Sequence, residues 1–181
     1  MLLIALGLIL WIVPHYWKRI APDHRAGVGD KGKMVVTVLS FVAIACMIFG
    51  YRSAETTFVW SLPGFVQHIN NLMMLVAFFL IGMSATTGRL RGKMRHPMLW
   101  GVIVWAVAHL LVNGDSASIL LFGGMLAWAV GSIILINRRE PVWDRPEPGA
   151  ASKDIILVVI TLVTFFIAAA IHILVGPNPF G

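Results

Sequence analysis

Six stretches of the chain are apolar for long enough to cross a lipid bilayer, and no other feature limits the fold as strongly. They cover residues 1–19, 34–52, 64–86, 97–113, 116–137 and 154–175. A helix needs about 20 largely apolar residues to span the hydrocarbon region. Of the 181 residues, 59% are hydrophobic and 12% are charged, whereas soluble domains carry roughly 25% charged residues. The sequence therefore predicts an all-α integral membrane protein, a single domain over residues 1–181 built as a bundle of six transmembrane helices.

The first stretch, MLLIALGLILWIV, is expected to be retained as a transmembrane helix. A secretory signal peptide carries a basic segment before its apolar run and a small-x-small cleavage site after it, and neither pattern is present. Farther along, Pro97 falls in the first turn of the fourth span, where a proline loses no hydrogen bond. Asp115 directly precedes the fifth span and is expected to be its N-cap.

Basic residues gather in alternate loops, which predicts the orientation of the chain in the membrane. The first, third and fifth loops hold thirteen of the fourteen Lys and Arg residues, and Arg52 is the remaining one. Short loops rich in Lys and Arg stay on the cytoplasmic side. We therefore expect a multi-pass protein of the cytoplasmic membrane with both termini on the non-cytoplasmic side. The net charge of +6 then reflects the membrane and does not indicate nucleic acid.

Histidines occur both at the surface and inside the predicted spans. His24 and His96 lie in or beside the cytoplasmic loops, and His15 lies about one turn inside the cytoplasmic end of the first span. The remaining three belong to three different spans, all toward the opposite leaflet: His68, His109 and His172. Polar side chains inside membrane spans are costly, so they usually face the bundle interior or a cavity.

The neighbours of these histidines fit an interior position. In the fourth span Trp105, His109 and Asn113 recur every four residues and are predicted to share one face. In the third span His68 and Asn71 share a face at a spacing of three. Of these residues we expect His68, Trp105, His109 and Asn113 to contribute to a cofactor site. Two other roles also fit an intramembrane imidazole, namely a hydrogen bond to a neighbouring helix and contact with lipid headgroups.

Haem suits this set of histidines better than a bare metal ion. Zinc takes three or four ligands from His, Cys or carboxylate side chains, and no Asp or Glu lies within the apolar part of any span. Haem needs one or two axial imidazoles and an apolar slot. The chain has seven Trp, ten Phe and nine Met residues with which to line one. A proton relay through the membrane normally uses an intramembrane carboxylate, which is missing here.

The segment RHPMLWGVIVWAVAHLLVNGDSASILLFG resembles the NnrU family of bacterial membrane proteins, together with LPGFVQHINN before it and AAAIHILVGPNPF after it. The likeness extends over nearly the whole chain, from PHYWKR onward. The family is associated with nitrite and nitric oxide respiration in denitrifying bacteria. It is also related to the plastid 15-cis-ζ-carotene isomerase, a membrane enzyme that uses haem b to isomerise a double bond in a polyene. The resemblance thus implies a haem-b-binding protein of the bacterial cytoplasmic membrane.

The resemblance also implies which histidines bind the haem. Two histidines are proposed as axial ligands in the carotene isomerase, and they match His15 in PHYWKR and His109 in AHL. Helix rise separates these two residues by roughly 10 Å along the membrane normal. On depth alone, His68 or His172 is the more natural partner of His109. We expect His109 to ligate the metal, with its partner open among His15, His68 and His172.

A second likeness concerns RHPMLWG, residues 95–101, which resembles an element of integral membrane methyltransferases that helps to hold S-adenosylmethionine. It would give His96 and Gly101 the main roles. The later element rich in Glu and Tyr that such enzymes carry is missing, since only Arg138, Arg139 and Glu140 lie in the right place. This departure makes methyl transfer the weaker interpretation.

The sequence therefore favours a haem-b-binding membrane protein with one of two roles. It acts either as a redox-gated isomerase of a polyene or as an accessory of nitrogen-oxide respiration. The expected partners are the lipid bilayer, haem and a hydrophobic polyene or respiratory protein. The alternatives are a haem-free transporter or scaffold and, less favoured, an S-adenosylmethionine-dependent methyltransferase.

Overall fold

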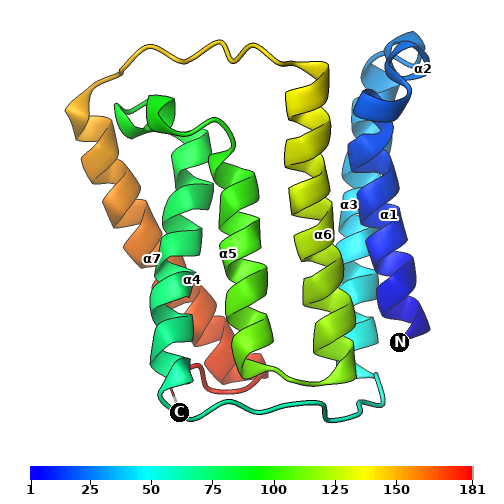
Figure 1. Cartoon of the computed structure of the whole chain (residues 1–181), viewed down its shortest axis with the longest axis vertical. Helices are drawn as coiled ribbons and strands as arrows, with labels where there is room; N and C mark the ends of the chain where they lie inside the picture. Colours follow the sequence, from blue (N-terminus) through cyan, green and yellow to red (C-terminus); the bar gives the residue numbers. More distant parts are fainter. Residues whose placement is uncertain (181) are drawn as a thin grey trace. The chain divides into compact units, whose positions relative to one another are not determined.

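The computed structural model describes residues 1–180, and over that range it is helical with a single isolated β-bridge (Figure 1). The elements in chain order are α1 (Leu2–Ile20), α2 (Pro22–Gly27), α3 (Asp30–Arg52), α4 (Val66–Ala85), the 3-10 helix η1 (Leu90–Lys93), α5 (Pro97–Val112), α6 (Ser116–Arg139) and α7 (Ala151–Val175). Each of the six predicted spans coincides with one long helix, so the prediction of an all-α membrane protein is confirmed.

The number of membrane crossings depends on whether each helix is long enough to span the bilayer. Five of the helices, namely α1, α3, α4, α6 and α7, are long and apolar enough to cross a bilayer. The helix α5 is apolar but has only 16 residues. At 1.5 Å per residue it is about 24 Å long, against roughly 30 Å of hydrocarbon. The structure therefore supports five spans by length, and the sixth stays a prediction.

Several helix ends differ from the predicted ones because polar residues extend the helices beyond the apolar stretches. The helix α3 begins at Asp30, four residues before the predicted start at residue 34. An acidic residue in the first turn is favourable near the positive end of the helix dipole, and Lys33 lies 2.9 Å from the Asp30 carboxylate. Two starts are as expected: Pro97 is the first residue of α5, and Asp115 caps α6 by accepting hydrogen bonds from the backbone N–H groups of Ala117 and Ser118, each 3.0 Å long.

The helices fall into two compact units, the first of which comprises residues 1–60 and 113–139. Here α1 packs against both α3 and α6. Gly7 of α1 faces Ala43 and Met47 of α3 closely enough that α1 and α3 lie in tight contact. The loop before α4 is joined to the start of α6, since the N–H of Val59 donates to the carbonyl of Gly114 at 2.7 Å.

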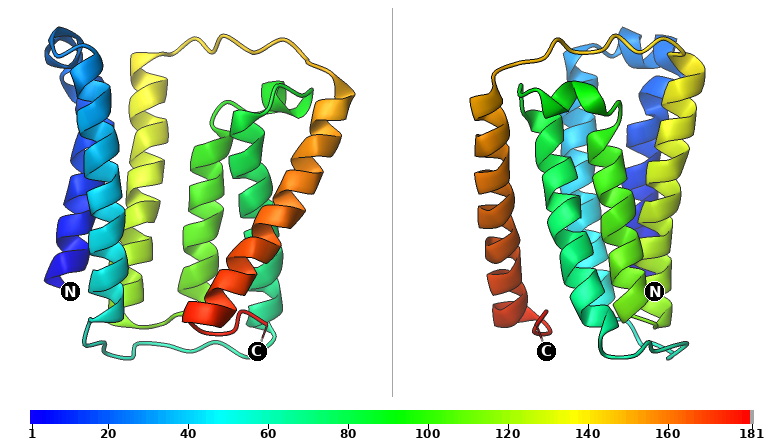
Figure 2. Two further views of the ribbon diagram at one scale, coloured as in Figure 1. Left: turned by 180° about the vertical axis from the view of Figure 1, so that it is seen from behind. Right: turned by 60° about the vertical axis from the view of Figure 1, so that its left-hand side comes forward.

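The second unit comprises residues 61–112 and 140–180. Its helix α4 packs against both α5 and α7, as the views in Figure 2 also show. The α4–α5 contact requires a glycine: a Cβ atom on Gly101 would lie 2.9 Å from the carbonyl oxygen of Ala77. The expectation of a single domain stays a prediction, because the division into units describes helix packing alone.

Each unit carries its basic residues mainly at one end. In unit 1 the antiparallel pair α1 and α3 brings Lys18 and Arg19 close to the level of Lys31 and Lys33. In unit 2 the loop that joins α4 to α5 holds four basic residues: Arg89, Arg91, Lys93 and Arg95. This loop is fastened to the start of α7, because the N–H of Leu90 donates to the carboxylate of Asp154 at 3.2 Å. The grouping of charges that predicts the orientation is thus kept in the fold.

Candidate functional site

Three of the six imidazoles are held in the same way by their own helices. In each, Nδ1 lies within hydrogen-bonding distance of the carbonyl oxygen four residues earlier. The pairs are His15 with Trp11 at 2.7 Å, His109 with Trp105 at 2.9 Å and His172 with Ala168 at 2.8 Å. A carbonyl oxygen can only accept, so Nδ1 carries the proton and a neutral ring keeps its lone pair on Nε2. Histidines that bind metals are usually held by such a bond through the other ring nitrogen.

Two of these imidazoles, those of His109 and His172, belong to unit 2 and lie near one level of it. The α4–α5 pair is antiparallel, with Gly101 beside Ala77. Because the two helices run in opposite directions, His109, eight residues after Gly101, lies near the level of Asn70, seven residues before Ala77. The sequence predicts both imidazoles toward the same leaflet, and this register of α4 with α5 puts His109 near the level of Asn70.

The α4–α7 pair leads to the same level from the other side. Phe78 of α4 and Phe165 of α7 have ring centroids 6.3 Å apart. This pair also runs antiparallel. Asn70, eight residues before Phe78, therefore lies near the level of His172, seven residues after Phe165. Asn70 thus lies near the level of both imidazoles.

Asn70 is the polar residue that inspection of the sequence did not select. Its side chain is 6% exposed, and its Nδ2 group donates to Oδ1 of Asn71 at 3.0 Å. Its Oδ1 atom is buried and has no hydrogen-bond partner among the described residues. Leaving a buried acceptor unpaired costs about 1–3 kcal/mol. The Asn-Asn pair inside a span was the available signal, and the period that places Val66, Asn70 and Ala77 on the buried face of α4 would have distinguished the first Asn from the second.

The other predicted site residues of this region are placed as follows. The rings of Trp105 and His109 have centroids 5.2 Å apart, in agreement with a shared helix face. Asn113 lies beyond Val112, where α5 ends, and it belongs to unit 1. The face expected to include it therefore ends one turn after His109. The side chain of His68, near the start of α4, is exposed.

His15 belongs to unit 1, where it is part of an aromatic cluster. Its ring stacks on Trp11 at 4.4 Å with an interplanar angle of 23°, and its edge meets Trp128 at 5.3 Å. The hydroxyl of Tyr16 donates to the carbonyl of Trp128 at 2.9 Å, which ties α1 to α6 beside the cluster. The indole N–H groups of Trp11 and Trp128 are buried and have no partner within the described residues.

The remaining two histidines lie at the ends of helices. Nδ1 of His24 accepts a hydrogen bond from the indole N–H of Trp17 at 3.0 Å. The carbonyl of His96 accepts from the backbone N–H of Trp100 at 3.0 Å and so helps to begin α5. Gly101, the glycine of the methyltransferase-like element, is explained by the close approach of α4. Helix packing therefore accounts for that residue without a cofactor.

Over residues 1–180, no three side chains from His, Cys, Asp and Glu lie together in an arrangement that could hold a metal ion. Haem asks for less, since one or two imidazoles suffice. The described residues therefore place single imidazoles in mostly apolar surroundings.

Comparison with known families agrees with the resemblance read from the sequence. The model of the family described as NnrU protein matches residues 3–179, which is nearly the whole chain. Comparison with curated proteins and with solved structures gives no match.

Proposed function

We propose, from the premise that the chain belongs to the NnrU family, that it is a haem-b-binding membrane protein in which His109 ligates the iron. The observation that carries this proposal is the placement of His109 and His172 near one level of unit 2. In both rings Nδ1 is held by the carbonyl of the residue's own helix. His172 is therefore the second axial ligand that we propose, in place of the His15 that the resemblance implies.

The residues present fit the requirements of haem. The Nδ1 atom of His109 lies 2.9 Å from the carbonyl oxygen of Trp105, so Nε2 is the nitrogen that we propose to ligate the iron. Trp105 lies against the ring of His109 and limits its rotation. Asn70 adds a buried acceptor near the same level, which can receive a hydrogen bond from a polar group in the site. Trp105 thus holds and orients the proposed donor, through its carbonyl oxygen and its ring.

The proposed chemistry follows from the cofactor. Haem b, if bound, would supply an iron that can change oxidation state and exchange a ligand. The part of the protein is to fix the imidazole of His109 firmly and to keep that of His172, which lies at the exposed edge of α7, displaceable. Such a centre serves a redox-gated isomerase of a polyene or an accessory of nitrogen-oxide respiration. A clear colour change on reduction with retention of both imidazoles would favour the respiratory role.

The proposed location is the cytoplasmic membrane of a bacterium, with α5 as a sixth span and both termini outside. Support comes from the apolar helices and from the clustering of the basic residues in alternate loops. The single cysteine, Cys46, lies inside α3, so a variant with this residue replaced accepts new cysteines at chosen positions. A cysteine at position 2 is expected to react with a membrane-impermeant maleimide in intact cells, and one at position 142 is expected to react only after lysis.

The first experiment is an absorption spectrum of the purified protein, oxidised and then reduced with dithionite, with a pyridine haemochrome assay. We expect a Soret band that sharpens on reduction, with separate α and β bands, because two imidazoles make the iron low-spin. A protein that stays colourless after reconstitution with haemin would exclude this function and favour a transporter or scaffold. Binding of S-adenosylmethionine that depends on His96 would instead favour methyl transfer.

A further inference from the structure

Three guanidinium groups are held at the end of unit 2 that carries η1, where residues 140–150 cross the loop between α4 and α5. The Nε atom of Arg145 donates to the carbonyl oxygen of Gly92 at 2.6 Å, and Nη1 of Arg91 donates to that of Met94 at 3.3 Å. Arg95, which follows Met94, donates from Nη2 to a carbonyl of the crossing segment. Backbone oxygens of one short loop and of the segment across it therefore hold all three groups.

The loop and the crossing segment lie in close contact, which fixes these groups relative to one another. A Cβ atom on Gly92 would lie 2.8 Å from the carbonyl oxygen of Pro146, and one on Gly149 would overlap the carbonyl oxygen of Thr87. Figure 1 shows η1 at the same end of the unit as the start of α7. The η1 end is thus a folded surface and not a set of independent side chains.

The positive charges of these arginines are not neutralised by the protein. Each bond to a carbonyl uses one of the five N–H donors of a guanidinium and brings no full negative charge. Among the described residues no carboxylate forms a salt bridge with Arg91, Arg95 or Arg145. Arg91 and Arg95 are also half-buried, and a charge partly removed from water is unfavourable unless it is paired. The carboxylates nearby are exposed or bonded to backbone: Asp144, Glu147 and Asp154.

The three groups lie at the expected level of the lipid headgroups. Arg95 is two residues before Pro97, the first residue of α5. In the first turn of α5, Met98 is 49% exposed and Trp100 is 44% exposed. Tryptophan is enriched where a membrane meets water. An anion bound by the arginines can therefore belong to a molecule whose apolar part lies along α5.

Phosphate is the anion that best matches this arrangement. The planar guanidinium group donates two parallel hydrogen bonds to phosphate oxygens, and basic pockets at the cytoplasmic ends of transmembrane helices bind the headgroups of anionic lipids. Exposed cations surround the three arginines and repel a headgroup that carries a positive charge of its own: Arg89, Lys93 and Lys153. A phosphate headgroup without a cation is therefore favoured.

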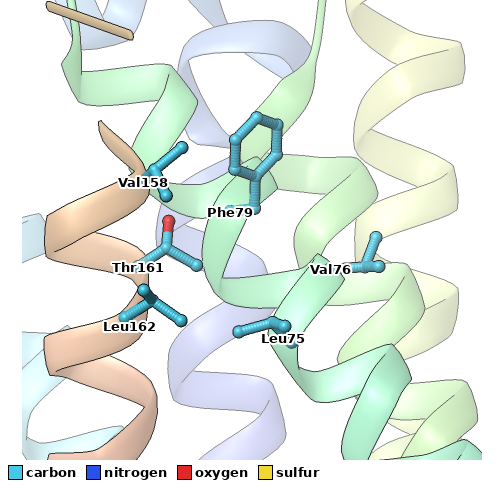
Figure 3. Close-up of a pocket in the computed structure, with 6 residues that line it drawn as sticks. All are labelled: Leu75, Val76, Phe79, Val158, Thr161 and Leu162. Atoms are coloured by element: carbon cyan, nitrogen blue, oxygen red, sulfur yellow. The ribbon is translucent and has the colours of Figure 1, made fainter. Parts of the chain in front are cut away.

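The cleft between α4 and α7, with a volume of about 250 Å³, offers no partner for such a headgroup (Figure 3). Its open walls are apolar. The hydroxyl of Thr161 is buried in the contact between the two helices and has no hydrogen-bond partner among the described residues. The polar part of a lipid therefore belongs at the η1 end of the unit and not in this cleft.

We propose that the η1 end of unit 2 binds an anionic phospholipid of the cytoplasmic leaflet, whose phosphate oxygens accept hydrogen bonds from the guanidinium groups of Arg91 and Arg145, with Arg95 beside them. The exposed cations of the loop attract the lipid, and the arginines held by carbonyls bind its headgroup. None of these residues belongs to the imidazole site, so this inference holds whether or not the protein binds haem.

Native mass spectrometry of the purified full-length protein in detergent tests this site. The probes are phosphatidylglycerol and phosphatidylcholine with the same acyl chains, and phosphatidylglycerol should bind the more tightly, by about fivefold. The double variant Arg91→Gln, Arg145→Gln removes two charges and keeps an N–H donor at each position. It should lower the affinity for phosphatidylglycerol by about tenfold or more, the worth of one charge-assisted hydrogen bond.

A matched double variant separates a site from general attraction. Arg89→Gln with Lys93→Gln removes the same two charges from exposed side chains of the same loop. At physiological salt it should change the affinity by no more than about twofold, because exposed charges are screened. Equal losses in the two double variants would overturn the proposal, since net charge alone would then explain the binding.

Two other results would also overturn it. Equal affinity for phosphatidylglycerol and phosphatidylcholine would mean that the surface does not select an anionic lipid. Displacement of phosphatidylglycerol by millimolar inorganic phosphate would make a soluble anion the ligand. Circular dichroism checks that each variant is folded. Arg145→Gln alone, which leaves the bonds of Arg91 and Arg95 in place, should still lower the affinity about fivefold and serves if the double variant does not fold.

Discussion

The two units have similar frameworks, each with three long helices and at least one imidazole held by its own helix, but they differ in what surrounds the imidazole. In unit 1 the half-buried ring of His15 stacks on Trp11 and meets Trp128 nearly at right angles. In unit 2 His109 shares its level with a second imidazole, His172, and with an unpaired amide oxygen. Unit 1 thus sets two indole rings against its imidazole, whereas unit 2 sets a second imidazole and a buried amide oxygen near the level of His109.

The unpaired polar atoms sharpen this difference. In unit 1 they are the indole N–H groups of Trp11 and Trp128, whose rings meet nearly edge to face at 5.4 Å and 80°. An N–H group can be partly satisfied by an aromatic face. In unit 2 they include the amide oxygen of Asn70, which only accepts hydrogen bonds and so cannot be satisfied by a ring face. A buried amide oxygen without a partner is therefore the better indicator of a missing ligand.

The largest effect should come from replacing the histidines of the two units one at a time. We expect His109→Ala to abolish haem absorbance in the purified protein, because it removes the ligand whose tautomer is fixed by Trp105. His172→Ala should leave haem bound but convert the low-spin spectrum to a high-spin one. His15→Phe keeps the aromatic packing against Trp11 and should leave the spectrum unchanged. Absorbance per mole of protein measures all three.

The opposite result in these variants would contradict the difference between the two units. Loss of the low-spin spectrum in His15→Phe, with a normal spectrum in His172→Ala, would make His15 the axial partner, as the family resemblance implies. His24→Ala serves as the control for a histidine at the surface, since its ring contacts Trp17 and lies outside both sites.

The next effect concerns the packing that sets the level of His109. A Cβ atom at Gly101 would lie 2.6 Å from a side-chain carbon of Ile81 and 2.9 Å from the backbone oxygen of Ala77, whereas one at Gly123 of α6 would have no neighbour within 4 Å. Gly101→Ala should therefore lower the free energy of unfolding by about 1–3 kcal/mol, the usual cost of overpacking. Gly123→Ala should not destabilise the protein. Unfolding by SDS in mixed micelles, followed by circular dichroism, compares the two.

Most of the fold could be predicted because the bilayer imposes one period and one length on each helix. Six apolar stretches became six helices, and local signals such as Pro97 and Asp115 marked their ends correctly. The start of α3 was misplaced because Asp30 and Lys33 are polar yet helical, which hydropathy alone does not reveal. The division into two units was not predicted, because it depends on which helices pack together. The helices that pack together are decided by close approaches, such as that of Gly7 in α1 to α3 and that of Gly101 in α5 to α4.

The candidate site was predicted only as far as depth along a single helix allows. Helix rise predicted that His109 and His172 lie toward the same leaflet, and the register of α4 with its two neighbours places both near the level of Asn70. Asn113 was placed on the face of His109 because the helical period was continued one residue too far, past Val112. Asn70 and Thr161 were missed because packing of the helices decides whether a buried side-chain oxygen has a hydrogen-bond partner. A sequence lists polar residues but not the partners that they lack.

A smaller effect is expected at the start of α6 in unit 1, where a carboxylate caps the helix. Oδ1 of Asp115 accepts two backbone hydrogen bonds of 3.0 Å, and the hydroxyl of Ser118 donates to Oδ2 at 2.6 Å. Asp115→Ala should lower the free energy of unfolding by about 1 kcal/mol. Asp30 also begins a helix but makes no side-chain cap, so Asp30→Ala is the control and should change stability within error. Equal effects would mean that the charge near the helix end matters more than the cap.

The smallest effect distinguishes the two asparagines of α4 and addresses the unpaired oxygen of unit 2 directly. In the haem-free protein, Asn70→Leu removes a hydrogen bond to Asn71 and also an unpaired buried oxygen; each is worth about 1 kcal/mol, so the two nearly cancel. Asn71→Leu removes a bond of 2.8 Å to the carbonyl of Pro179 and strands the amide of Asn70, so it should cost about 1–2 kcal/mol. SDS unfolding of both variants measures the difference. If Asn70→Leu proves as costly as Asn71→Leu, the amide oxygen of Asn70 already has a partner, and unit 2 is then as self-contained as unit 1.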